Sequence, residues 1–147
     1  MRTHVARLTF VVLSVSAIGF ATSCGSSSSP SAPSGQTNTV TFSTQIQQQM
    51  LNPACVSCHT DEGRTPASNL NLKTGVSIAN LVNIASVGKS GAVRVIPGNP
   101  SGSYLIQKLE GAPDIVVLRM PRNGPPYLTT EQVALIRQWI QNGAPNN

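Results

Sequence analysis

The stretch Cys55-Val56-Ser57-Cys58-His59 decides the fold of this 147-residue chain. It has the form C-x-x-C-H, which is the attachment pattern of a c-type haem. The two thiols can add across the two vinyl groups of one porphyrin, and the adjacent imidazole then faces the iron from one side. We therefore expect one covalent haem c, bonded to Cys55 and Cys58, with His59 as the proximal iron ligand.

A structural zinc site is an alternative use for two cysteines and a histidine. Such a site needs four ligands, which usually come from two clusters. The sequence contains one such cluster, and its only other histidine is His4. The motif therefore favours haem over zinc, and over a chance match in a surface loop.

The N-terminal sequence predicts export from the cytoplasm. Two arginines flank the start of a mainly apolar run over residues 8–20, which is shorter than the roughly 20 residues needed to span a bilayer. The boundary Ala21-Thr22-Ser23-Cys24 resembles a bacterial lipoprotein processing site, although Ala21 stands where Leu is more common. We expect a lipoprotein signal peptide over residues 1–23 and a lipid on Cys24.

The cysteine count supports lipidation of Cys24. The chain has three cysteines, and haem attachment would use Cys55 and Cys58. A remaining cysteine in an exported protein needs an explanation, which a lipid supplies. A free thiol after ordinary cleavage, or an intermolecular bond, is the alternative.

Composition divides the exported part into a tether and a domain. Residues 25–39 are rich in Ser, Pro and Gly and carry no charge, so we expect a lipidated cysteine and flexible linker over residues 24–39. Residues 40–147 have the common size of one domain. This organisation predicts a lipid-anchored domain in the cell envelope or periplasm. Gly25, rather than an acidic residue, follows Cys24, which favours the outer membrane in a cell that has one.

The charge pattern argues against nucleic-acid binding. The formal net charge of the chain is +5. It falls by two to +3 when Arg2 and Arg7 leave with the signal peptide, and to about +1 with two haem propionates. The sequence has no cluster of Lys and Arg. We expect redox proteins and a membrane as partners, and no small-molecule substrate.

Four segments after residue 40 have the pattern of helices. The clearest is the last, where Thr129 and Gln132 form a capping box and apolar residues recur at helical spacing. The expected starts are Ser43 or Thr44, Thr74, Asn99 with Pro100, and Thr129. The expected ends are Asn52-Pro53, Val82, Leu109 before Gly111-Ala112-Pro113, and Gly143. Residues 61–71 indicate a loop and residues 87–96 an extended stretch without a sheet, so the predicted fold class is mostly α.

The second axial position of the iron determines the function. His4 lies in the predicted signal peptide, so the mature chain offers Met50 or Met120 as a thioether ligand. Met50 lies on the apolar stripe of the first helix, where Met usually fills the core. Met120 lies in a proline-rich loop that can hold its thioether rigidly, and it is the expected distal ligand. An open site, Met50 or a lysine are the alternatives.

Two further positions bear on the haem environment. The second imidazole nitrogen of His59 needs an acceptor, and a backbone carbonyl near Thr65-Pro66 is the candidate. Trp139 is expected to be a core residue that packs near the haem and the first helix.

The motifs, taken in chain order, resemble those of a known family. They are Cys55-Val56-Ser57-Cys58-His59, Val95-Ile96-Pro97-Gly98-Asn99-Pro100 with Ser103-Tyr104-Leu105, Met120-Pro121, and Leu128-Thr129 through Trp139-Ile140 and Gly143-Ala144. In this order they resemble a class I-type cytochrome c domain of the single-haem, planctomycete-like subgroup, over about residues 42–144. Asn99 stands where an acid is common in that subgroup. The resemblance implies a compact helical fold wrapped around one covalent haem c, with His59 and Met120 as axial ligands.

Ligation by His59 and Met120 predicts a one-electron carrier rather than an enzyme. A six-coordinate iron has no vacant position for a substrate, and both oxidation states keep the same ligands. One alternative is a haem enzyme or gas sensor with an open distal site, which the lack of a distal histidine weakly opposes. The other is a haem-containing docking subunit of a larger complex.

Overall fold

The computed structural model describes residues 39–63 and 65–147 of the chain. They belong to the second of the two units into which the chain divides, Thr37–Asn147. The predicted signal peptide, Cys24 and nearly all of the predicted linker lie outside the described residues. Within those residues, no helix is both long enough and apolar enough to cross a membrane.

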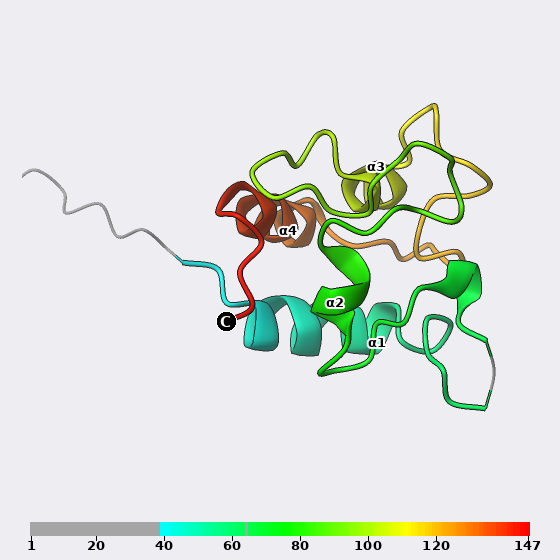
Figure 1. Ribbon diagram of the computed structural model, residues 1–147, viewed down its shortest axis with the longest axis horizontal. Coiled ribbons are helices and arrows are strands. Elements are labelled where there is room, and N and C mark those ends of the chain that lie inside the picture. The colour runs from blue at the N-terminus through cyan, green and yellow to red at the C-terminus, as the bar shows by residue number, and fades with distance from the viewer. Residues whose placement is uncertain (1–38, 64) are drawn as a thin grey trace, which may run out of the picture. The chain divides into compact units, whose positions relative to one another are not determined.

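Helices are the regular elements of the described part of the chain (Figure 1). In order they are the π-helix η1 (Phe42–Leu51), α1 (Asn52–Ala54), the 3-10 helix η2 (Ala67–Asn69), α2 (Ser77–Leu81), α3 (Tyr104–Glu110) and α4 (Thr130–Gln141). No strand forms over residues 39–63 and 65–147, where two isolated bridges join Val82 to Val95 and Ala85 to Val93. The predicted mostly α class is confirmed. Residues 87–96 form no sheet, as predicted, but they run through turns and bends rather than one extended stretch.

The apolar stripe predicted for the first helix faces the core. Phe42, Ile46 and Met50 are all buried. The capping role predicted for Ser43 or Thr44 is wrong, because both residues lie inside η1 and its N-terminal flank carries no side-chain cap. The apolar spacing therefore located the helix, while the capping residues did not.

The end predicted for the first helix at Asn52-Pro53 is also wrong. The helix continues as α1 to Ala54, directly before the C-x-x-C-H motif. Pro53 lies in the first turn of α1, where the missing N–H of proline is tolerated. The Cys55 N–H donates to the Leu51 carbonyl at 2.9 Å, so the helical path leads directly to the first cysteine.

Helix α2 is shorter than the segment predicted from Thr74. Gly75 adopts a φ of +90°, a left-handed conformation that suits glycine, and α2 begins only at Ser77. The Thr74 hydroxyl does not cap the helix but donates to Asn52 Oδ1 at 3.3 Å. The predicted end at Val82 is confirmed.

Helix α3 begins at Tyr104, four residues later than predicted at Pro100. Asn99 Oδ1 accepts the Gly102 N–H at 2.9 Å, so this side chain closes a separate turn before the helix. Gly111 ends α3 in a left-handed conformation with a φ of +74°, as the sequence predicts. The Asn-Pro pair is therefore a turn signal here, and the glycine is the stop signal.

Helix α4 matches its prediction at both ends. Thr129 and Gln132 form the reciprocal capping box, and Gly143 follows the helix with a φ of +91°. Trp139 is fully buried, and its ring centroid lies 5.0 Å from that of Phe42. The predicted packing of this tryptophan against the first helix is confirmed.

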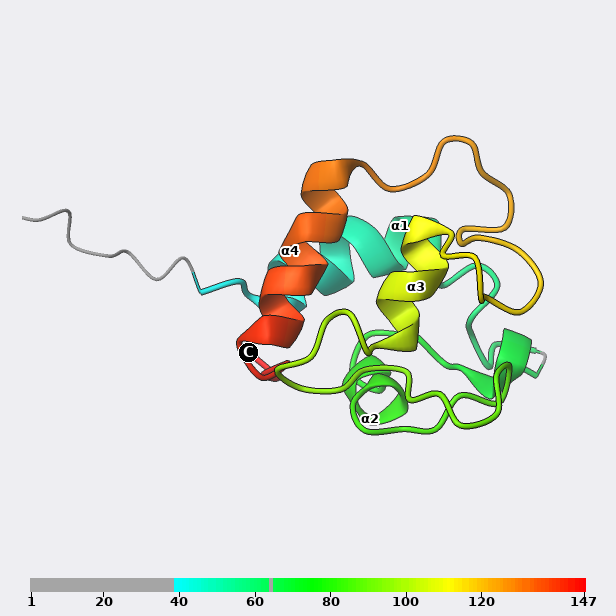
Figure 2. The same cartoon turned by 90° about the horizontal axis from the view of Figure 1, so that it is seen from above.

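The core lies where η1, α3 and α4 meet. Helix α4 contacts both η1 and α3, and the two views of the ribbon show it crossing η1 (Figures 1 and 2). The C-terminal residue closes this arrangement, because Asn147 Oδ1 accepts the Phe42 N–H at 2.7 Å. Residues 55–59 and 67–72 and the loop between α3 and α4 border this core, where Leu72 is buried in it and Cys55, Leu70 and Met120 pack against it.

Candidate functional site

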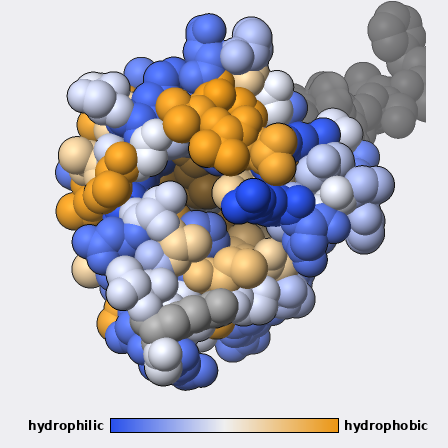
Figure 3. Space-filling model, turned by 90° about the vertical axis from the view of Figure 1, so that its right-hand side faces the viewer, coloured by the Kyte–Doolittle hydropathy of each residue, from blue (hydrophilic) through white to orange (hydrophobic). Residues whose placement is uncertain are grey.

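A cavity of about 510 Å³ is formed by three segments of the chain. The first segment comprises residues 54–59 and 67–72, the second residues 81–94 and the third residues 104–123. Figure 3 shows a hollow bordered by hydrophobic atoms, on the side where Figure 1 places η2 and the loop between α3 and α4. The cavity volume lies in the usual range for sites that bind small molecules and cofactors.

The C-x-x-C-H motif lies on the wall of this cavity. Cys55, Cys58 and His59 all line it, and neither of these two cysteines forms a disulfide. The Cys58 and His59 N–H groups both donate to the Cys55 carbonyl, at 3.1 and 3.0 Å. This turn at the end of α1 brings the three side chains to one cavity, as the sequence analysis expected.

The two thiols differ in their surroundings. Cys58 is exposed, whereas Cys55 is partly buried at the edge of the core. Burial, with a smaller contribution from the nearby Cys58, raises the pKa of the Cys55 thiol to about 11. Cys55 is therefore a protonated thiol at neutral pH.

His59 is held by backbone groups on both sides. Its Nδ1 atom lies 3.0 Å from the Ala67 carbonyl oxygen, and its own carbonyl accepts the Leu72 N–H at 2.8 Å. The acceptor predicted near Thr65-Pro66 is thus one residue further along the chain. Pro66 turns the chain into η2, which places the Ala67 carbonyl beside the imidazole ring.

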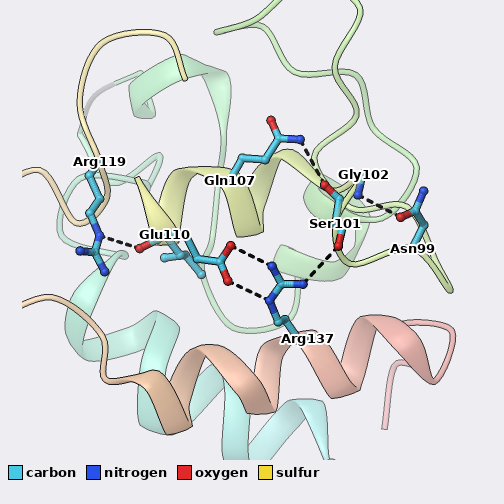
Figure 4. Close-up of polar contacts among 8 residues, drawn as sticks. Asn99, Ser101, Gly102, Gln107, Glu110, Arg119 and Arg137 are labelled. Carbon is cyan, nitrogen blue, oxygen red and sulfur yellow. Dashed lines mark hydrogen bonds and ion pairs between the residues drawn. The ribbon is translucent and has the colours of Figure 1, made fainter. Parts of the chain in front are cut away.

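Met120 also lines the cavity, whereas Met50 does not. Met50 is buried in the core on η1, as its place on the apolar stripe indicated. The Met120 N–H donates at 2.9 Å to the carbonyl of Lys108, which lies in the C-terminal part of α3. Next to it, Arg119 Nε donates to the Leu109 carbonyl at 2.7 Å (Figure 4).

The remaining lining is mainly aliphatic and carries three cations. Leu70, Leu72, Leu81, Leu105, Leu109, Val116 and Val117 supply most of the apolar surface. Arg94, Lys108 and Arg122 supply positive charge, and no Asp or Glu is among the described residues of the lining. Such a wall suits a large apolar ligand that carries carboxylates.

Arg94 is the least expected of these cations, because only 7% of it is exposed. Its guanidinium donates to the carbonyls of Asn80 (2.8 Å), Ser68 (3.1 Å) and Asn69 (3.0 Å). Burial lowers the pKa of Arg94 from its ordinary value, and burial likewise lowers that of Lys108. Arg94 joins η2 to the segment after α2 and borders the cavity.

The sequence analysis missed Arg94, Lys108 and Tyr104 as cavity residues. Tyr104 and Lys108 are four residues apart, so their helical spacing could have placed them on one face of α3. Arg94 stands alone among valines, which could have indicated a buried charge. Trp139, expected near the haem, is not among the residues that line the cavity.

The donor set of this cavity fits a covalent haem. Two thiols and an imidazole from one motif and a thioether from a separate segment line one space, which is the set that a six-coordinate haem c uses. The aliphatic wall fits the porphyrin ring, and the three cations fit its two carboxylates. These residues therefore form a suitable haem pocket by size, charge and donor chemistry.

Within residues 39–63 and 65–147, no group of three or more His, Cys, Asp or Glu side chains is placed to hold a metal ion. No protein-family model, no curated protein and no solved structure matches the chain.

Proposed function

We propose that this chain is an exported, membrane-tethered cytochrome c with one haem, which carries single electrons between redox partners. The observation that supports this proposal most strongly is the convergence of Cys55, Cys58, His59 and Met120 on one cavity. Met120 is far from the motif in sequence, and all of α2 and α3 lies between them. A chance C-x-x-C-H match gives no reason for such a convergence.

Each of the four residues has a distinct role in this proposal. Cys55 and Cys58 form thioether bonds to haem c, and His59 binds the iron while its Nδ1 proton is held by the Ala67 carbonyl. Met120 would be the second side chain that binds the iron. Covalently bound haem supplies an iron that exchanges one electron between its ferrous and ferric states.

Occupation of both axial positions by side chains supports electron transfer rather than catalysis. With His59 and Met120 in place, the chain leaves no vacant position for a substrate or a gas. A thioether ligand and an aliphatic wall both favour the ferrous iron, which raises the reduction potential.

The location of the protein follows from its N-terminal sequence. Export in a bacterial cell, a lipid on Cys24 and a flexible linker would hold the domain beside a membrane of the envelope. We propose membrane-associated redox proteins as its partners. Neither nucleic acid nor a small-molecule substrate is part of this function.

The mass of the mature native protein is the most direct test. We expect removal of residues 1–23, acylation of Cys24 and the addition of one haem. The colour should resist extraction by acid and acetone, because the haem is covalently bound. Colourless native protein, or extractable pigment, would disprove the proposal.

A matched pair of substitutions tests the distal ligand. Met120→Leu should give a high-spin iron that binds carbon monoxide readily, because the substitution removes the only thioether of the cavity. Met50→Leu keeps the volume of a buried core residue and should leave the spectrum unchanged. Equal spectra for Met120→Leu and wild type would exclude Met120 as a ligand.

Measurements on the wild-type protein distinguish the proposed electron carrier from a haem enzyme or gas sensor and from a docking subunit. Rapid, stoichiometric binding of carbon monoxide to the reduced wild type would favour a haem enzyme or gas sensor with an open distal site. Tight partner binding with electron exchange too slow for turnover would favour a docking subunit. A low-spin ferrous spectrum with slow carbon monoxide binding is expected for the carrier.

A further inference from the structure

Helix α3 holds the segment that precedes Met120 through one lysine. Lys108 Nζ donates to the Val116 carbonyl at 2.9 Å and also to the Leu118 carbonyl. The carbonyl of the same lysine accepts the Met120 N–H at 2.9 Å. The side chain of Lys108 therefore binds Val116 and Leu118, and its main chain binds Met120, so every second residue from 116 to 120 is held.

Val117, between the two carbonyls bound by Lys108, has an unfavourable backbone conformation. Its φ is +66°, in the left-handed region that β-branched residues rarely adopt. Its side chain is 70% exposed, so burial of that side chain does not explain the conformation. Such strain persists only where neighbouring contacts impose it, and Lys108 donates to the carbonyls of both residues next to Val117.

Lys108 differs from the other residues that bind this loop. Tyr104 accepts the Val116 N–H through its hydroxyl at 3.0 Å, and Lys89 donates to the Asp114 carbonyl at 2.9 Å. Each of those makes one contact with the loop before Val117. The Lys108 side chain binds two carbonyls of the loop, at Val116 and Leu118, and the second is two residues before Met120. Lys108 also lies on the wall of the cavity.

We propose that Lys108 is a positioning residue for Met120, and that it determines how firmly the Met120 sulfur is held toward the iron. This inference rests on the proposed function, in which Met120 is the distal ligand. Without the ammonium group, the carbonyls beside Val117 lose their donors and the segment can relax to a more favourable conformation. Met120 would then leave the second axial position for a larger fraction of the time.

The experiment compares three variants of the full-length holoprotein. Lys108→Met keeps an unbranched stem of similar length and removes the donor. Lys108→Arg restores a cationic donor, and Lys89→Met is the matched control because it removes one hydrogen bond to the same loop outside the cavity lining. The readouts are the sulfur-to-iron charge-transfer absorption of the ferric protein and the rate of carbon monoxide binding to the ferrous protein.

We expect Lys108→Met to weaken the charge-transfer absorption and to speed carbon monoxide binding about tenfold or more, because it removes hydrogen bonds from a charged donor. Lys108→Arg should recover most of the absorption, and Lys89→Met should stay within about twofold of wild type. Circular dichroism should show the same helix content in all holoproteins. If Lys108→Met does not assemble, Lys108→Leu, a shorter side chain without a donor, takes its place.

The outcomes separate this inference from the proposed function. Suppose that Met120→Leu loses the charge-transfer absorption but Lys108→Met keeps both this absorption and the carbon monoxide binding rate of the wild type. That result would overturn the role of Lys108 and leave ligation by Met120 intact. A wild type that lacks the absorption and is unaffected by Met120→Leu would overturn ligation by Met120, and the role of Lys108 with it.

Discussion

The Nδ1 atom of His59 lies 3.0 Å from the carbonyl oxygen of Ala67. Because a carbonyl oxygen can only accept, Nδ1 is the donor, and the lone pair of the neutral ring is on Nε2. Ala67 belongs to η2, whose next two residues, Ser68 and Asn69, are bound by Arg94. Arg94, a residue of the cavity wall, thus binds the backbone of η2, which orients the His59 imidazole.

The His59 hydrogen bond predicts slow exchange of one imidazole proton. In the diamagnetic ferrous protein, the Nδ1 proton should exchange with solvent much more slowly than in a free imidazole, although His59 is at the exposed side of the site. Proton NMR with solvent-saturation transfer measures that exchange. Exchange at the rate of an unbonded imidazole would show that the Ala67 carbonyl does not hold the ring.

Removal of the Arg94 guanidinium should both destabilise the protein and loosen the His59 ring. Arg94→Met should lower the free energy of unfolding by about 2 kcal/mol, because three partly buried hydrogen bonds from a charged donor to backbone carbonyls are lost. The same variant should speed exchange of the His59 Nδ1 proton. Denaturant unfolding of the holoprotein measures the first effect.

Arg122→Met is the control for Arg94→Met. Arg122 also lines the cavity but is exposed, so its removal should change the free energy of unfolding by less than about 0.5 kcal/mol. If both substitutions changed the free energy of unfolding equally, positive charge on the cavity wall would explain the effect, and the hydrogen bonds from Arg94 to the carbonyls would not.

Gln47 should be a strongly stabilising polar residue in spite of its burial. Its Nε2 donates to Asn52 Oδ1 (2.7 Å) and the Leu72 carbonyl (2.9 Å), and its Oε1 accepts from Ser77 Oγ. Gln47→Met keeps the shape and removes these three hydrogen bonds, which should cost about 1–3 kcal/mol. Gln48→Met, on the exposed side of η1, should cost less than about 0.5 kcal/mol in the same thermal unfolding measurement.

The ion pair between α3 and α4 should give a small, pH-dependent stabilisation. Arg137 donates from Nε and Nη2 to the two carboxylate oxygens of Glu110, both at 2.8 Å (Figure 4). The hydrogen bonds from Arg137, with smaller contributions from the charges of Arg137 and Arg119, hold the pKa of Glu110 below its ordinary value of 4.5. Both partners are partly exposed, so the pair should contribute about 0.2–1 kcal/mol.

The sign of this pH dependence follows from the lowered pKa. The unfolded chain binds a proton at Glu110 more readily, so the stabilisation is complete above pH 4.5 and is lost as the pH falls through the folded-state pKa. Glu110→Gln should therefore reduce stability at pH 7 and have little effect at the acid end. A double-mutant cycle with Arg137→Gln, repeated in high salt, measures the coupling. Coupling that grows on acidification would contradict this account.

Local patterns were sufficient to predict some elements and insufficient for others. The capping box at Thr129 and the glycine stop at Gly143 act within one helical turn, and α4 matches its prediction. Asn99 was expected to cap a helix, but its side chain closes a turn before α3. The Ser103 hydroxyl accepts the N–H of Ile96, seven residues earlier, and a local capping pattern does not predict that contact. Pro53 was expected to end a helix, but it stands in a first turn that tolerates it.

The sequence alone predicted the site of haem attachment, the preference for Met120 over Met50 and the helical class of the fold. The C-x-x-C-H spacing and the apolar periodicity are properties of neighbouring residues, because bonded geometry and helical repeat act over short distances. Which carbonyl and which cations reach the cavity could be seen only in the tertiary structure. Ala67, Arg94 and Lys108 come from three different segments, and they meet there because burial of the core around Ile46, Ile106 and Trp139 packs those segments together.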